Sequence, residues 1–192
     1  MIFARTALAA TLAATALAAH AESGTYAIDP AHTQAIFEIG HSGTSTLRGR
    51  FDKKEGTVQF DRAAKTGKVE ITLDTSSIST GVAPFDTHLK SKDFFNAAEM
   101  PTAKFVGDKF SFDAAGKVTS VAGALTLAGK TQPLTLTAAN FNCYENPMLK
   151  REVCGGDFET TIQRSQWGMN WGANFGAPDA VHLVIQVEAI KQ

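Results

Sequence analysis

Short segments in which apolar and polar residues alternate cover most of the chain. In one of them, QAIFEIGH, the side chains of Ala35, Phe37, Ile39 and His41 share a face, because successive residues of a strand point to opposite sides. A polar turn and a second alternating segment, STLRGRF, follow at once. The pattern predicts an antiparallel hairpin whose apolar wall ends in a histidine.

The same period of two returns along the rest of the chain, and residues typical of turns separate the alternating segments. Further strands are predicted at residues 56–61, 68–74, 103–112, 117–129, 132–141, 157–164 and 180–190. About eight strands joined by short links indicate a closed barrel or a sandwich.

One connection, from Thr75 to Pro101, is too long for a hairpin turn. Phe85 and Leu89 stand there at a helix-like spacing. Because long connections in compact domains tend to be functional, we expect a short helical connection that caps one mouth of the barrel. It would present Phe94 and Phe95 to the interior, although the two rings could instead only seal that end of the barrel.

The first 21 residues have the features of a secretory signal peptide. They contain one basic residue, Arg5, then an alanine- and leucine-rich run and an A-x-A ending at Ala21. A transmembrane helix is the alternative, but it needs roughly 20 strongly apolar residues. We therefore expect cleavage after Ala21 and one β-domain over residues 22–192, which places the protein in the periplasm if its source is Gram-negative.

The net charge and the two cysteines limit which partners and metal sites we expect. Loss of Arg5 from the 18 basic residues leaves 17 against 19 acidic ones, a net charge of −2, which argues against nucleic acid as a partner. In an exported chain the two cysteines, Cys143 and Cys154, are expected to form a disulfide that closes an exposed loop. Their spacing matches no common zinc pattern, so no metal site is expected there.

Several motifs, in this order along the chain, resemble the YceI-like family of secreted, lipocalin-like polyisoprenoid-binding proteins. They are the D-x-x-H-x-x-x-x-F-x-x-x-H start at Asp29, STLRGRF, HLKSKDFF, PTAKF, the segment 123–136 and IQRSQWGM at 162–169. Two features depart from the family pattern: the segment between the cysteines, and Trp167 where the family usually has Phe.

The resemblance implies an all-β, eight-stranded antiparallel, lipocalin-like β-barrel whose interior holds an isoprenoid or other long-chain lipid. The interior of such a barrel is either just filled by side chains or able to hold one small ligand. The residues expected to contact the ligand are Phe37, Ile39, His41, Arg48, Phe51, Phe60, Ile71, Leu73, His88, Phe94, Phe95, Phe105, Leu125, Trp167 and Met169.

Basic side chains near the predicted mouth could orient a pyrophosphate or quinone head group. His41, Arg48 and Arg50 flank the first turn, and His88 and Lys90 lie on the long connection. Alternatively, the arginines of the first hairpin, with Lys53 and Lys54, form a solvated face.

Other polar residues are assigned structural roles. His32 and His41 could bond the backbone near strand ends, and His182 is expected to point to solvent. Arg164 is expected to pair with Asp29 or Asp179 as a salt bridge at the end of the barrel.

Signatures of common enzymes are missing from the sequence: there is no G-x-S-x-G, P-loop or H-E-x-x-H motif, and no G-x-G-x-x-G after a strand. A serine near His41, Ser42 or Ser45, lacks an identifiable orienting carboxylate. We therefore expect no catalytic residues and no cofactor.

Two functions remain. The first is a periplasmic carrier of a lipid, with transient membrane contact. The second is a periplasmic redox accessory protein that binds quinone, haem or metal through histidines such as His41 and His88. The oligomeric state is left open.

Overall fold

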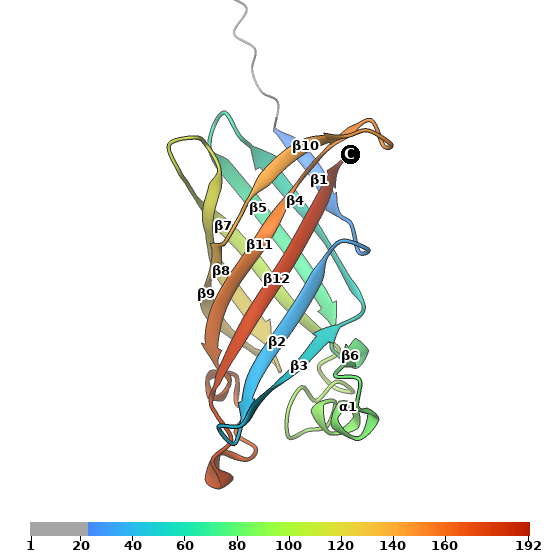
Figure 1. The fold of residues 1–192 in the computed structure, drawn as a ribbon, viewed down its shortest axis with the longest axis vertical. Coiled ribbons are helices and arrows are strands. Elements are labelled where there is room, and N and C mark those ends of the chain that lie inside the picture. Colours follow the sequence, from blue (N-terminus) through green and yellow to red (C-terminus); the bar gives the residue numbers. More distant parts are fainter. Residues whose placement is uncertain (1–22) are drawn as a thin grey trace, which may run out of the picture.

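The computed structural model describes residues 23–192, and the predicted signal peptide lies outside the described residues. One antiparallel sheet of twelve strand segments curls into a closed barrel (Figure 1). Closure occurs at β11 (Arg151–Gln163), which pairs with β12 (Ala180–Lys191) from Val153 to Gln163 and also with β9 (Lys130–Ala138). The prediction of an all-β, eight-stranded antiparallel barrel is therefore confirmed.

The twelve segments make an eight-stranded barrel because four of its long strands are each interrupted into two segments. The interrupted strands are β1 with β2, β3 with β4, β5 with β6, and β9 with β10. On one side of β3 and β4, β2 pairs with β3 and β1 with β4; on the other side, β6 pairs with β3 and β5 with β4. β9 and β10 likewise both pair with β11. The remaining segments are β1 (Gly24–Ile28), β2 (Gln34–His41), β3 (Ser45–Phe51), β4 (Lys54–Asp61), β5 (Thr66–Asp74), β6 (Ile78–Ser79), β7 (Thr102–Phe112), β8 (Val118–Leu127) and β10 (Asn142–Asn146).

Each alternating segment of the sequence contains a strand, whereas β1, β6 and β10 were not predicted. β10 corrects one expectation, since the residues between the cysteines are not simply an exposed loop. They form a hairpin in which Cys143 of β10 lies directly opposite Cys154 of β11. The predicted disulfide between these two residues is confirmed.

The long connection contains the expected short helix, α1 (Ala83–Leu89), at the end of the barrel drawn at the bottom of Figure 1. The backbone N–H and hydroxyl of Thr80 both donate to the Asp86 carboxylate at 2.7 Å, which holds the helix against β6. Fully buried Thr75 donates its hydroxyl to the carbonyl of Met100 at 2.8 Å. The start and the end of the connection are therefore joined. None of the helices within residues 23–192 has the length and hydropathy needed to cross a bilayer.

The buried core has two parts along the barrel axis. One surrounds Tyr26, Phe60 and Phe158 near the disulfide, and the other surrounds Phe51 and Trp167 near α1. Partly buried residues that contact both parts join them: Leu125, Leu134 and Ile185.

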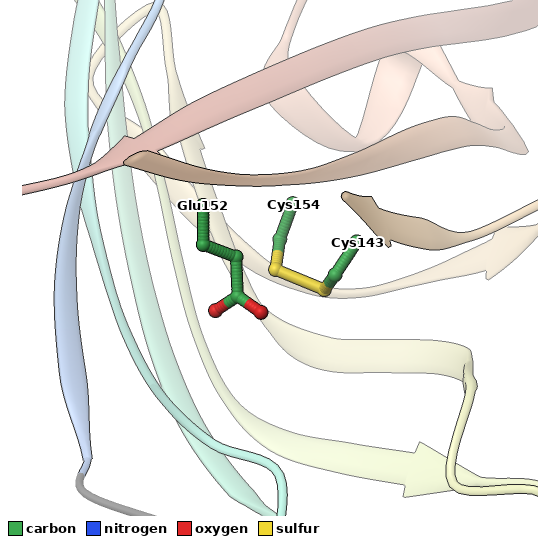
Figure 2. Close-up of side chains that lie close together, drawn as sticks. All are labelled: Cys143, Glu152 and Cys154. Atoms are coloured by element: carbon green, nitrogen blue, oxygen red, sulfur yellow. A yellow bond between two sulfur atoms is a disulfide. The ribbon is translucent and has the colours of Figure 1, made fainter. Parts of the chain in front are cut away.

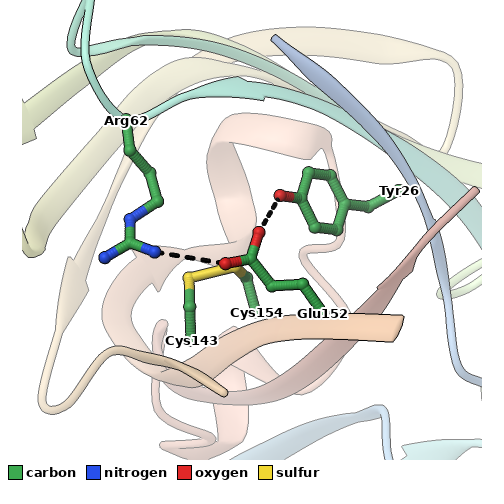
Figure 3. The surroundings of a disulfide bond; sticks show 5 residues. All are labelled: Tyr26, Arg62, Cys143, Glu152 and Cys154. Atoms are coloured by element: carbon green, nitrogen blue, oxygen red, sulfur yellow. Dashed lines mark hydrogen bonds and ion pairs between the residues drawn. A yellow bond between two sulfur atoms is a disulfide. The ribbon is translucent and has the colours of Figure 1, made fainter. Parts of the chain in front are cut away.

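At the disulfide end of the barrel, a small polar cluster lies beside the apolar core. Glu152 lies beside the Cys143–Cys154 bridge (Figure 2). The Tyr26 hydroxyl donates to one Glu152 oxygen at 2.5 Å, and Arg62 pairs with the other oxygen at 3.2 Å (Figure 3). Burial of the phenol, with a contribution from the Glu152 carboxylate, raises the pKa of Tyr26 far above its usual range.

Candidate ligand-binding cavity

A cavity of about 420 Å³ occupies the half of the barrel nearest α1. Its walls come from the inward faces of β2, β3, β5, β7, β8, β9, β11 and β12. The long connection contributes Leu89, Phe94 and Phe95, and the segment between β11 and β12 contributes Arg164, Met169, Trp171, Gly172 and residues 175–178. The lining is almost entirely apolar, and its size is within the range of about 300–1,000 Å³ usual for ligand sites.

Most of the residues expected from the sequence to contact a ligand line this cavity. The alternation of the strands and the family motifs indicated these positions. They are Phe37, Ile39, His41, Phe51, Ile71, Leu73, Phe94, Phe95, Phe105, Leu125 and Met169. Whether each of them contacts a ligand stays a prediction.

Phe60 and Trp167 lie elsewhere. Phe60 lines a second, smaller cavity of about 70 Å³ near the disulfide. Trp167 is buried in the wall rather than exposed to the cavity, because its indole N–H donates to the carbonyl of Leu125 at 3.1 Å. The tryptophan that departs from the family pattern therefore fixes the end of β8 instead of lining the main cavity.

Arg48 lies on the outside of the barrel. Its neighbours Leu47 and Phe51 line the cavity, so the period of two turns Arg48 outward, where its Nε donates to Glu38 at 2.6 Å. Arg50 likewise pairs with Asp52 at 2.8 Å, and both arginine side chains are more than half exposed. The structure thus places both arginines on the solvated outer face of the hairpin, as in the alternative interpretation of the sequence.

His88 is close to the mouth without lining the main cavity. Its Nε2 lies 3.1 Å from Asp93, and its ring packs edge-on against Phe94 and Trp171 with centroid distances of 5.0 and 4.5 Å. Because the two aromatic neighbours line the cavity, His88 supports its wall from behind.

His32 and His182 have partners of their own, away from His88. His32 pairs with the Asp29 carboxylate at 2.7 Å, and this contact lowers the pKa of Asp29 and raises that of His32. His182 lies on the outer face, where it pairs with Glu38 and Glu159. Within residues 23–192, the only group of three possible metal ligands is Cys143, Glu152 and Cys154, whose two thiols are joined in the disulfide.

Arg164 corrects another expectation. Instead of a salt bridge with Asp29 or Asp179, its guanidinium donates to two backbone carbonyls: Nε to Pro178 at 2.8 Å and Nη1 to Met169 at 2.6 Å. Asp179 instead accepts bonds from the hydroxyl and the backbone N–H of Ser165, which lower the pKa of the Asp179 carboxyl. Arg164 is buried and lines the cavity.

Several cavity residues were not singled out from the sequence. Leu183 and Ile185 line the cavity from β12 and follow the alternation of that strand, so the pattern could have identified them. Trp171 and Phe175 lie in an irregular segment without periodicity, and no pattern indicates their position. Both are exposed at the rim, Phe175 by 89%.

The polar lining is confined to one end. Among the described residues, the polar side chains of the lining are those of His41, Ser42 and Arg164, which lie at the end of the barrel with Trp171 and Phe175. Toward the disulfide the lining is apolar, and four residues border both cavities: Ile71, Phe105, Leu136 and Ile185. The interior is an apolar space with one polar rim.

A closed antiparallel barrel with an apolar interior and a polar rim defines a lipocalin-like class of protein. Residues 26–189 match the YceI-like domain, and the chain belongs to the YceI-like family. A relative from Pseudomonas aeruginosa (strain LESB58), called UPF0312 protein, is 34% identical over 191 residues, which cover 95% of this chain and 98% of the relative.

Solved structures agree on the fold. The YCEI protein of Campylobacter jejuni is similar with a TM-score of 0.68 and 25% identity, over 80% of this chain and 90% of that one. A domain from Saccharophagus degradans, described as polyisoprenoid-binding, is similar with a TM-score of 0.65 over 89% of this chain and 100% of that one. At 13% identity this second likeness shows the shared barrel alone.

Proposed function

We propose that this protein binds a long-chain amphiphilic lipid, of the isoprenoid type or a fatty chain, inside the barrel and carries it in the periplasm. The observation that supports this most directly is the cavity of about 420 Å³, which is apolar along its depth and polar only at its rim. An amphiphile fits this distribution with its chain inside and its head at the mouth. The proposal is a binding protein rather than an enzyme.

The expected driving force is burial of the chain. Each CH₂ group removed from water contributes about 0.8 kcal/mol, so a long chain binds tightly without any single decisive contact. The description of the Saccharophagus degradans domain as polyisoprenoid-binding supports an isoprenoid as the first candidate.

The location and the membrane contact belong to the same proposal. The features of residues 1–21 support export, and the disulfide suits an oxidising compartment. Trp171 and Phe175, which are exposed at the rim of the cavity, would contact the membrane surface while the lipid is taken up.

Mass spectrometry of an organic extract of the natively exported protein tests the proposal. We expect about one lipid per protein and a featureless visible spectrum. A Soret band or stoichiometric metal would instead support the histidine-based redox protein.

A matched pair of variants tests the cavity itself. Phe37→Asp places a charge on the cavity wall and is expected to abolish lipid copurification. Leu149→Asp, at an exposed position in the β10–β11 turn, is the control and should carry normal lipid. A folded Phe37→Asp protein that still carries full lipid would show that the chain lies elsewhere.

A further inference from the structure

Arg164 is the single charged side chain among the described residues of the cavity lining. It lies where β11 ends and a 3₁₀ turn (Arg164–Trp167) begins, and only 4% of its surface is exposed. The carbonyls of Pro178 and Met169 accept from its Nε and Nη1 and hold the guanidinium in place.

This cation has no carboxylate partner in the part of the chain that the structure describes. No Asp or Glu oxygen there lies within ion-pair distance. The Asp179 carboxylate is bound by Ser165, and the Arg164 charge lowers the pKa of Asp179 only as a smaller contribution, from beyond ion-pair distance. The third guanidinium nitrogen, Nη2, makes no hydrogen bond to a described protein atom, and the Arg164 side chain lines the cavity. A buried charge is costly unless an opposite charge or hydrogen bonds compensate it.

We propose that Arg164 binds the head group of the lipid and that this head is anionic, with a carboxylate or phosphate oxygen. This inference rests on the proposed function and adds the head-group chemistry to it. Arg164 lines the cavity and keeps Nη2 free of protein partners, and guanidinium donors match the geometry of carboxylate and phosphate oxygens. His41 and Ser42, which lie at the same polar rim, would be the other polar neighbours of the head group.

The orientation of the ligand follows from this position. The head lies at the rim against Arg164, and the chain runs along the apolar lining toward Phe105 and the second cavity. The guanidinium is already fixed by two carbonyls, so little side-chain entropy is lost when the head binds.

The first experiment uses the unaltered protein after delipidation. Isothermal titration calorimetry compares dodecanoate and dodecyl phosphate with methyl dodecanoate and dodecanol, which have the same chain without a charge. We expect at least one anion to bind about tenfold or more tightly than the neutral ligands, the effect of a hydrogen bond to a charged group. The tighter anion identifies a carboxylate or a phosphate as the natural head.

A second experiment locates the effect. Arg164→Gln is expected to remove the preference for the anion while leaving affinity for dodecanol within about threefold, and Arg164→Lys should keep part of the preference. Arg48→Gln, in an exposed ion pair on the outer face, is the matched control and should bind like the unaltered protein. Retention of the preference in folded Arg164→Gln would overturn the assignment.

The outcomes separate the inference from the proposed function. Equal binding of charged and neutral ligands to the unaltered protein overturns the anionic head but leaves the lipid carrier intact. If none of the four ligands binds, both proposals are wrong. The comparison of ligands needs no variant, so the test holds even if substitution of Arg164 prevents folding.

Discussion

The ring of Phe37 occupies the space that a side chain at position 49 would need. Phe37 of β2 and Gly49 of β3 are cross-strand partners, and a Cβ atom on Gly49 would collide with the Phe37 ring. The absent side chain lets Phe37 lie close to the wall, beside Phe51 at a centroid distance of 6.3 Å. The cavity therefore depends on a glycine that does not itself line it.

Gly49→Ala is expected to push the Phe37 ring toward the cavity. Overpacking of this kind costs about 1–3 kcal/mol of unfolding free energy, and the smaller cavity should weaken binding of long chains. Denaturant unfolding and calorimetry with dodecanol measure the two effects. Gly40→Ala is the control for stability, because its new methyl group would meet only Pro178, at an ordinary 3.7 Å. Unchanged stability and affinity in Gly49→Ala would contradict this account of Phe37.

Phe105→Leu tests whether the length of the chain is limited inside the barrel. Phe105 borders both cavities, so a smaller residue should join them and admit more of the chain. Each further CH₂ buried adds about 0.8 kcal/mol, so the affinity ratio of hexadecanol to dodecanol should rise. Phe112→Leu, on the same strand but bordering neither cavity, should leave the ratio unchanged. An equal change in both variants would show that the division between the cavities does not select chain length.

Removal of the disulfide is expected to lower stability more than binding. Replacing both Cys143 and Cys154 by Ser opens a loop with a sequence separation of 11, which costs about 2–4 kcal/mol in the chain-entropy account. Neither residue lines the main cavity, so affinity for dodecanol should change by less than about threefold. Thermal unfolding and calorimetry measure the two effects, and thiol titration of the native protein should find no free cysteine.

Tyr26 is expected to make the fold sensitive to alkali. The pKa of Tyr26 is raised in the folded protein, so its contribution to stability is fully present below the ordinary tyrosine value of about 10. That contribution is lost as the pH rises from about 10 toward the higher value of the folded state.

Absorbance at 295 nm should show this shift in Tyr144→Phe, since the chain has two tyrosines and only Tyr26 would remain. The midpoint should lie above that of the same variant in urea. Tyr26→Phe should remove this part of the alkaline loss of stability. Coincident midpoints in folded and unfolded protein would contradict the burial argument.

Strand alternation made much of the barrel predictable, because a half-buried strand has one apolar face. The same rule should have placed Arg48 outside: Leu47 and Phe51 are the apolar residues of β3, and Arg48 alternates with them.

The alternation of strands could not predict that Arg164, Trp171 and Phe175 line the cavity, and the reason is physical. They follow the end of β11, where the chain turns through residues with positive φ such as Gly168 and Gly172 and has no fixed period. Side-chain direction there depends on long-range contacts, such as the bond from Arg164 to the Pro178 carbonyl.

Both ends of the described chain lie at the disulfide end of the barrel, away from the mouth. Tyr26 near the start pairs with Lys191 near the end, and Figure 1 shows both ends beside β10, opposite α1. A linker at either end would therefore anchor the protein with its mouth facing outward. On a sensor chip or a bead, every copy attached in this way would present the same open rim to vesicles in solution.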